Sequence, residues 1–239
     1  MSEPIILKSL DLMIRTEPHS FPAAERAAIE AHWQRVLAAN PKLWNGSAFL
    51  FDGWRVDDGG FSAEGALTDF AAFLHWRSLP ANERRHFHLF PVGAIISRDQ
   101  RLLVGRMSAH TANAGRHYPP SGSFDASDLV PLGNGTARLD VEANMYREIS
   151  EELGLAADRF DPESCWLLFP SSPNAHALVR LLHVPETSDD LSPEIRAHMA
   201  ADPHQELEDI RFIDYDTRFA PQASVPYVND LLAYLAARG

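Results

Sequence analysis

Apolar residues recur along the chain in two patterns, one typical of β-strands and one typical of α-helices. The two patterns follow one another along the sequence and so predict strands interleaved with helices. Short apolar or alternating runs predict strands near residues 5–14, 47–51, 90–96, 101–106, 164–169, 175–184 and 207–213. Apolar positions at helical spacing predict helices at residues 23–39, 66–77, 141–153 and 226–237. Strands and helices that alternate in this way favour the α/β class, with a mixed sheet.

Two polar stretches interrupt this pattern. Residues 110–136 are rich in Gly, Pro, Ser and Asp, and they lead into the helix expected at 141–153. Loops of this length within a compact domain are usually functional or disordered. The second stretch, residues 185–204, separates the last strand pair from the strand at 207–213. The first stretch is therefore expected to border a functional site.

The helix expected at 141–153 carries acidic residues at spacings that share one helix face. Glu148, Glu151 and Glu152 lie three, four and one residue apart, so their side chains are expected to converge. Apolar residues spaced four apart should instead pack on a sheet: Met145, Ile149 and Leu153. Converging carboxylates repel one another unless a cation lies among them, and Mg²⁺ prefers such oxygen ligands. A solvated acidic face is the competing interpretation of the three residues alone.

Composition narrows the possible partners. The 239 residues carry a formal net charge of −12 and show no basic stripe, which argues against a nucleic-acid polymer as partner. The single cysteine, Cys165, cannot form an intrachain disulfide. No signal peptide and no apolar run of bilayer length is evident. We therefore expect a cytoplasmic protein without a membrane partner.

The residues Arg147-Glu148-Ile149-Ser150-Glu151-Glu152-Leu153-Gly154-Leu155 resemble the C-terminal half of the Nudix signature. The string also follows an expected hairpin and a Pro/Gly/Ser loop, as it does in that family. The resemblance implies an α/β/α sandwich over residues 86–239, with residues 1–85 as an N-terminal α+β extension. It also implies a metal-dependent hydrolase, which cleaves the diphosphate of a nucleoside diphosphate linked to another group.

By position in the motif, the resemblance makes Glu148, Glu151 and Glu152 ligands of Mg²⁺, or of Mn²⁺ in its place. Arg147 lies four residues before Glu151 and could orient it through a charge-assisted hydrogen bond. One of these glutamates, or a carboxylate from a later loop, would act as general base. The implied partner is a small nucleotide derivative, and the chain would act as a monomer or a homodimer.

The upstream half of the signature departs from the family pattern. The family places a Glu eight residues before the Arg, and here that position is Leu139. The run Pro120–Asp125 is similar to the start of the motif, which implies an insertion over residues 126–138. Ser121 would then offer a metal-facing carbonyl, Gly122 would approach the substrate, and Asp125 could replace the missing acid. Alternatively, Asp125 and Asp128 are turn-forming residues of a flexible loop.

Further candidates lie outside the motif. Glu206 is a candidate late carboxylate, whereas Glu208 alternates with apolar Leu207 and is expected to face solvent. Arg106 and Arg116 flank the expected entrance and could clamp phosphate. Several histidines also lie near the expected site loops without metal-ligand spacing: His110, His117, His176 and His204.

The N-terminal region gives a clue to the identity of the substrate. Residues 40–47 and 67–74, together with the inserted loop, loosely resemble Nudix hydrolases that cleave UDP-glucose and UDP-galactose. That resemblance implies hydrolysis of a UDP-sugar to UMP and sugar 1-phosphate. Two alternatives stay open: a pyrophosphatase acting on ADP-ribose or coenzyme A, and a catalytically silent Nudix module that binds a ligand.

Overall fold

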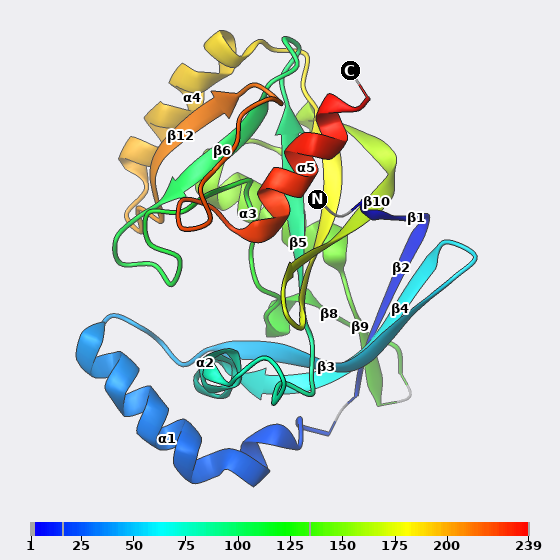
Figure 1. Cartoon of the computed structure of the whole chain (residues 1–239), viewed down its shortest axis with the longest axis vertical. Coiled ribbons are helices and arrows are strands. Elements are labelled where there is room, and N and C mark those ends of the chain that lie inside the picture. The colour runs from blue at the N-terminus through cyan, green and yellow to red at the C-terminus, as the bar shows by residue number, and fades with distance from the viewer. Residues whose placement is uncertain (1–2, 16, 134, 239) are drawn as a thin grey trace.

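The computed structural model contains two β-sheets and five α-helices over the residues it describes, which are 3–15, 17–133 and 135–238 (Figure 1). The central sheet carries the helix with the acidic motif. The second sheet is built mainly from N-terminal strands and lies beside the central one. Mixed sheets with packed helices confirm the α/β class.

The central sheet follows the order β1-β10-β11-β5-β6-β12, and β7 pairs with β6. Only β11 and β5 run parallel; the other neighbours are antiparallel, so the sheet is mixed as predicted. Its strands are β1 (Ile5–Leu7), β5 (His88–Ile96), β6 (Leu102–Met107), β7 (His117–Tyr118), β10 (Asp161–Ser172), β11 (Ala175–His183) and β12 (Leu207–Ile213).

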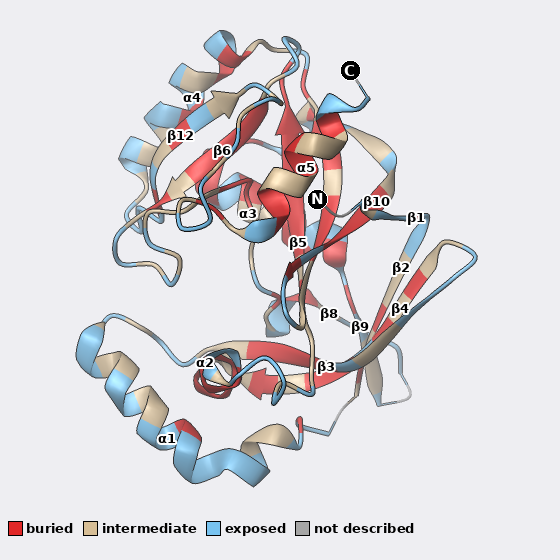
Figure 2. Ribbon diagram, viewed as in Figure 1, coloured by how far each residue is buried: buried red, intermediate tan, exposed pale blue. Residues whose placement is uncertain are grey.

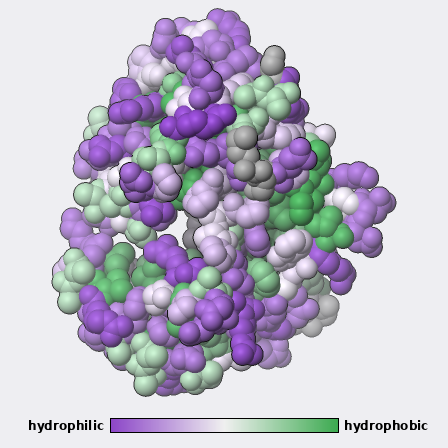
Figure 3. All heavy atoms as spheres, in the orientation of Figure 1, coloured by the Kyte–Doolittle hydropathy of each residue, from purple (hydrophilic) through white to green (hydrophobic). Residues whose placement is uncertain are grey.

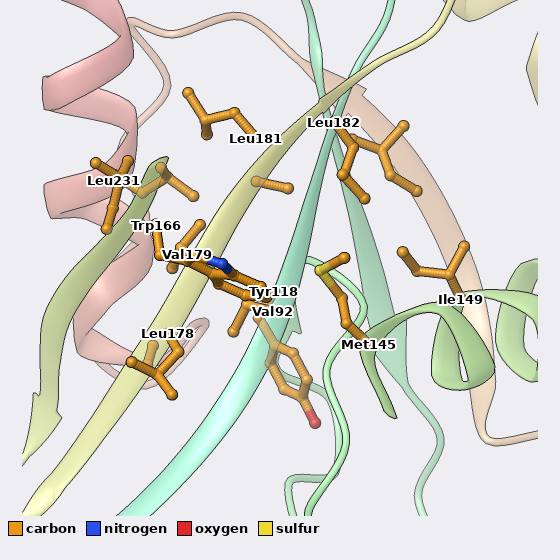
Figure 4. Close-up of a cluster of buried hydrophobic side chains, with 14 of the residues drawn as sticks. Val92, Tyr118, Met145, Ile149, Trp166, Leu178, Val179, Leu181, Leu182 and Leu231 are labelled. Atoms are coloured by element: carbon orange, nitrogen blue, oxygen red, sulfur yellow. The ribbon is translucent and has the colours of Figure 1, made fainter. Parts of the chain in front are cut away.

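Helices cover both faces of this sheet. Helix α3 (Val141–Leu153) packs on β5, and α5 (Pro226–Ala236) packs on β10. Figure 4 shows Met145 and Ile149 of α3 on one side of the strands and Leu231 of α5 on the other. A third helix, α4 (Ser188–Ala201), lies against β12 and α3. This arrangement is the expected α/β/α sandwich.

The second sheet follows the order β3-β4-β2-β9-β8. Helices α1 (Phe21–Ala39) and α2 (Phe70–Ser78) pack against each other, and α2 also contacts β3. Figure 2 shows α1 as mostly exposed, and Ile29 is its one buried residue. The strands are β2 (Ser9–Arg15), β3 (Ser47–Asp57), β4 (Gly60–Asp69), β8 (Leu129–Pro131) and β9 (Thr136–Leu139).

Strand pairing crosses the expected boundary between residues 85 and 86 in both directions. N-terminal β1 pairs with β10 in the central sheet. In return, β9 pairs with β2, so the inserted segment belongs to the second sheet. Residues 129–131 and 136–138 of the inserted segment thus pair within the second sheet, and the division into two domains stays a prediction.

Two sequence predictions of secondary structure are wrong. The helix expected from residue 66 begins only at Phe70, because residues 66–69 continue β4 and pair with β3. The Asp69 side chain caps the helix by accepting from the Ala72 amide at 2.8 Å. The polar stretch at 185–204 contains α4, which Thr187 and Asp190 start with a reciprocal capping box. Helix α4 was missed because its buried face is narrow.

Among the described residues, no helix combines the length and the apolar character needed to cross a membrane.

Candidate active site

The acidic motif lies on α3, whose ends are set by local chemistry. The Asp140 side chain accepts from the Ala143 amide at 2.9 Å and so caps the first turn. At the other end, Gly154 adopts a left-handed conformation (φ 73°), which glycine reaches without steric cost. Met145 and Ile149 are buried against the central sheet. Because this apolar face of α3 is packed on the sheet, the acidic residues lie on another face of the helix.

Glu148, Glu152 and Glu206 line one cleft of about 420 Å³. Glu148 and Glu152 come from α3, whereas Glu206 precedes β12 and is held by a hydrogen bond from the Ser108 amide to its carbonyl at 2.9 Å. The structure thus brings Glu206 to the motif helix, while Glu208 pairs with Arg106 at 3.0 Å. Glu151 is exposed and is not among the cleft-lining residues.

The two α3 carboxylates are held in an unfavourable environment for negative charge. Burial raises the pKa of Glu148 to about 7, although Arg147 opposes the shift. Burial, followed by repulsion from Glu148 and Glu206, raises the pKa of Glu152 well above its ordinary value. A cation among these oxygens would remove both penalties. The chemistry of this donor set, which consists of carboxylate oxygens, fits a hard divalent ion such as Mg²⁺ or Mn²⁺.

The loop at residues 120–123 closes over the same carboxylates. Ser121 forms an isolated bridge with Val92 of β5, and both Ser121 and Gly122 line the cleft. A β-carbon at Gly122 would overlap the carboxylate of Glu148. A larger residue at position 122 would therefore force the Glu148 carboxylate to move. Ser121 and Gly122 thus line the same cleft as Glu148 and Glu152, and their roles toward a metal and a substrate stay predictions.

Arg147 contacts a different acid from the one expected. Its guanidinium binds both oxygens of Asp128, and it reaches Glu148 Oε1 at 3.4 Å and Asp125 Oδ2 at 3.6 Å. No hydrogen bond or ion pair joins Arg147 to Glu151 among the described residues. The expected Arg147–Glu151 contact is therefore wrong.

Asp128 is the acid that Arg147 contacts through both carboxylate oxygens. It is buried, and its Oδ2 also accepts from Asn144 Nδ2 at 2.8 Å and from the Asp125 amide at 2.9 Å. Leu139, at the family's position for that acid, is buried in the core. Sequence reasoning weighed Asp128 as a turn residue; its one sequence signal was that it is the only acid in the inserted loop.

The remaining predicted residues lie at varied distances from the carboxylates. Arg116 lines an adjoining cleft, whereas Arg106 pairs with Glu208 and lines neither cleft. Of the four histidines named, only His110 lines the carboxylate cleft. His176 instead packs edge-on against Trp54, and its pKa is lowered by burial.

The N-terminal region supplies cleft residues that sequence reasoning missed. Lys42, Trp44 and Phe70 line the carboxylate cleft, and Trp44 is 79% exposed. Asn40 Nδ2 donates to the His110 carbonyl at 2.9 Å, which ties this segment to the 108–116 loop. Figure 3 shows the molecule hollowed between the part that carries α1 and α2 and the part that carries the central sheet. Within the sequence, Trp44 itself was the available signal for this wall of the cleft.

A second polar cluster lies apart from this cleft. The ligand atoms of His19, Asp52 and His86 lie within 4.8 Å of one another, a spacing that could suit a metal ion; no other such group of three occurs in the described residues. However, His19 Nδ1 accepts from the Phe21 amide at 3.1 Å, so the ring proton is on Nε2 and points to Asp52. Arg15 covers the other Asp52 oxygen. We interpret this cluster as a structural hydrogen-bond network.

Comparisons with known proteins point to one group of folds. No family model matches the sequence, and no curated protein matches it. Among solved structures, the chain is similar to a MutT protein from Methanosarcina mazei Go1, with 14% identity, 64% of this chain and 94% of that chain covered, and a TM-score of 0.40. A MutT NUDIX hydrolase from Burkholderia pseudomallei matches at 21% identity, with 62% and 96% covered and a TM-score of 0.38. An Ap4A hydrolase from C. elegans matches at 15% identity, with 63% and 96% covered and a TM-score of 0.38.

Proposed function

We propose that this chain is a metal-dependent hydrolase of the Nudix type, which cleaves the phosphoanhydride bond of a nucleoside diphosphate derivative. The observation that carries the proposal is that Glu148, Glu152 and Glu206 line one cleft. Two of these carboxylates are held where burial disfavours their charge. Such shifts in a cleft are typical of functional sites.

The chain's own residues offer the ligands for a divalent cation. Glu148 and Glu152 would hold it, with Glu151 at the exposed edge of the same helix and a backbone carbonyl from Ser121. When bound, Mg²⁺ or Mn²⁺ would neutralise charge on the diphosphate and acidify a bound water. Asp128 and Arg147 act as positioning residues, because their ion pair ties the inserted loop to the acidic face of α3.

Glu206 is the residue we assign as general base. Its support is that it lines the same cleft as Glu148 and Glu152 but comes from a loop outside the helix. In the proposed step, a water oxygen attacks one phosphorus and the bridging P–O bond breaks. The water's proton passes to the Glu206 carboxylate, and the bridging oxygen leaves with the second phosphoryl product.

Several groups are candidates for attachment to the nucleoside diphosphate. A UDP-sugar, cleaved to UMP and sugar 1-phosphate, is one candidate; ADP-ribose and coenzyme A are others. The exposed ring of Trp44 at the cleft mouth supports a substrate with a planar base, because bases stack readily on aromatic side chains. The proposed hydrolase would act in the cytoplasm, and its partner would be a small-molecule nucleotide.

Phosphate-coupled turnover across a panel of these nucleotides, with and without Mg²⁺, tests the proposal. We expect metal-dependent turnover of at least one substrate. In Glu152→Gln, kcat should fall roughly a thousandfold, because a metal stabilises the transition state by several kcal/mol. The control is Asp158→Asn, which removes an exposed acid just beyond α3.

A ligand-binding module without catalysis is the competing function. It predicts no metal-dependent turnover of any nucleotide in the panel and unchanged nucleotide binding in Glu152→Gln. That combination would contradict the proposed hydrolase. Retained turnover in Glu152→Gln would contradict the assignment of this carboxylate as a metal ligand.

A further inference from the structure

A second, larger cleft of about 720 Å³ adjoins the carboxylate cleft. The two clefts share lining residues, among them Phe70, Tyr118 and Gly122, so they form one continuous groove. The carboxylates lie at one end of this groove. Its other end is lined by arginines instead, so the two ends suit opposite charges.

Three arginines line the second cleft: Arg77 in the last turn of α2, Arg84 in the following segment, and Arg116 in the loop before β7. No carboxylate among residues 3–15, 17–133 and 135–238 lies within 4.0 Å of any of them. This is unexpected in a chain of net charge −12, where most other arginines pair with acids. The three arginines are therefore available to an anion.

The arginines also oppose one another. Desolvation lowers the pKa of Arg77, and the charges of Arg116 and Arg84 lower it further, whereas Tyr118 opposes the shift. Arg84 is held in place by donating to the Leu79 carbonyl at 2.9 Å, and its guanidinium lies 5.7 Å from the Trp76 ring. Arg77 packs over Phe73 at 5.8 Å. Like charges held together without a counter-charge are favourable only when an anion joins them.

Between the arginines, the cleft wall is aromatic and uncharged. His88 stacks on Phe90 with ring centroids 5.3 Å apart, and burial lowers its pKa to about 3, so it is neutral at physiological pH. Phe73 lies 4.6 Å from the same imidazole ring. A neutral aromatic wall beside cations suits a planar ring that carries phosphate.

We propose that Arg77, Arg84 and Arg116 form a second anion subsite, which binds a phosphate monoester of the substrate remote from the bond that is hydrolysed. The substrate class is then a nucleoside pyrophosphate with an additional phosphate on its ribose. The identity of the hydrolysed bond rests on the proposed function, whereas the phosphate subsite can be tested without catalysis.

The first test measures binding in EDTA, where no hydrolysis occurs. Adenosine 2′,5′-bisphosphate and adenosine 3′,5′-bisphosphate are each compared with AMP by isothermal titration calorimetry. We expect at least one bisphosphate to bind about tenfold more tightly than AMP, and Arg77→Gln and Arg116→Gln each to remove that difference. Arg55→Gln, an exposed arginine on β3 that lines neither cleft, is the matched control. Arg84 is left intact because it also supports the fold.

The second test compares turnover of substrates that differ by one phosphate. NADPH is compared with NADH, and coenzyme A with its dephospho form, in the presence of Mg²⁺. We expect kcat/KM to favour the phosphorylated member of at least one pair by about tenfold, and the Arg77→Gln/Arg116→Gln double variant to abolish the preference.

The outcomes separate the two proposals. Bisphosphates that bind no more tightly than AMP, or binding that both arginine variants leave unchanged, would overturn the anion subsite even if hydrolysis occurs. Arginine-dependent bisphosphate binding in a protein that hydrolyses none of these substrates would support the subsite and overturn the proposed hydrolase.

Discussion

At the scale of single residues, the Arg147–Asp128 pair organises the candidate site. The two residues are 19 apart in the chain, and the carboxylate is buried, so the guanidinium is the positive charge that compensates it. A buried acid that loses its partner is strongly destabilising, because the remaining charge stays without compensation. Asp128 therefore links the stability of the inserted loop to the orientation of the acidic helix.

Removing the charge of Asp128 should weaken both the fold and the activity. In Asp128→Asn, Arg147 would keep its hydrogen bond to Ser127 and its longer contacts to Asp125 and Glu148, and we expect the free energy of unfolding to fall by about 3 kcal/mol. Urea denaturation measures the change, and kcat should fall with it. The matched control is Asp125→Asn, whose partner distance of 3.6 Å is longer. A larger loss of stability in Asp125→Asn would contradict the assigned role of Asp128.

Glu148 gives a pH prediction for the metal-free protein. Its pKa is raised to about 7 in the folded state, so the folded state binds a proton that the unfolded state releases near pH 4.5. Stability should therefore decrease as the pH rises from about 4.5 to 7 and then level off. In Glu148→Gln the part of this decrease that comes from Glu148 should be absent, while the part that comes from the raised pKa of Glu152 remains, so the variant should be more stable than the wild type by up to about 3 kcal/mol at pH 8 in EDTA. Thermal unfolding at pH 5 and pH 8 measures it; a variant less stable than wild type at pH 8 would contradict the account.

At the scale of elements, the predictions succeeded where the information is local. Helix α3 has the predicted bounds, because its cap at Asp140, its end at Gly154 and its apolar face all lie within the segment itself. Strand β12 likewise matches its alternating pattern. The prediction of a helix over residues 66–69 failed. These residues have helical spacing, but cross-strand pairing with β3 extends β4 through them. Tertiary pairing overrides such local patterns.

At the scale of the whole molecule, the groove depends on contacts between distant segments. The acidic end comes from α3 and the loop before β12, whereas Trp44, Arg77 and Arg84 come from the N-terminal part of the chain. No spacing rule connects these residues, so sequence reasoning could find the helix half of the site but not its opposite wall. The inserted loop could be located, but its pairing with β2 could not.

Direct measurement of Mn²⁺ binding tests the central claim that the carboxylate cleft holds a divalent cation. Isothermal titration calorimetry would compare wild type, Glu152→Gln and the control Asp158→Asn in nucleotide-free protein. The account predicts that wild type and control bind Mn²⁺ alike, and that Glu152→Gln binds at least about tenfold more weakly. Equal affinity in wild type and Glu152→Gln, or no binding by the wild type, would contradict it.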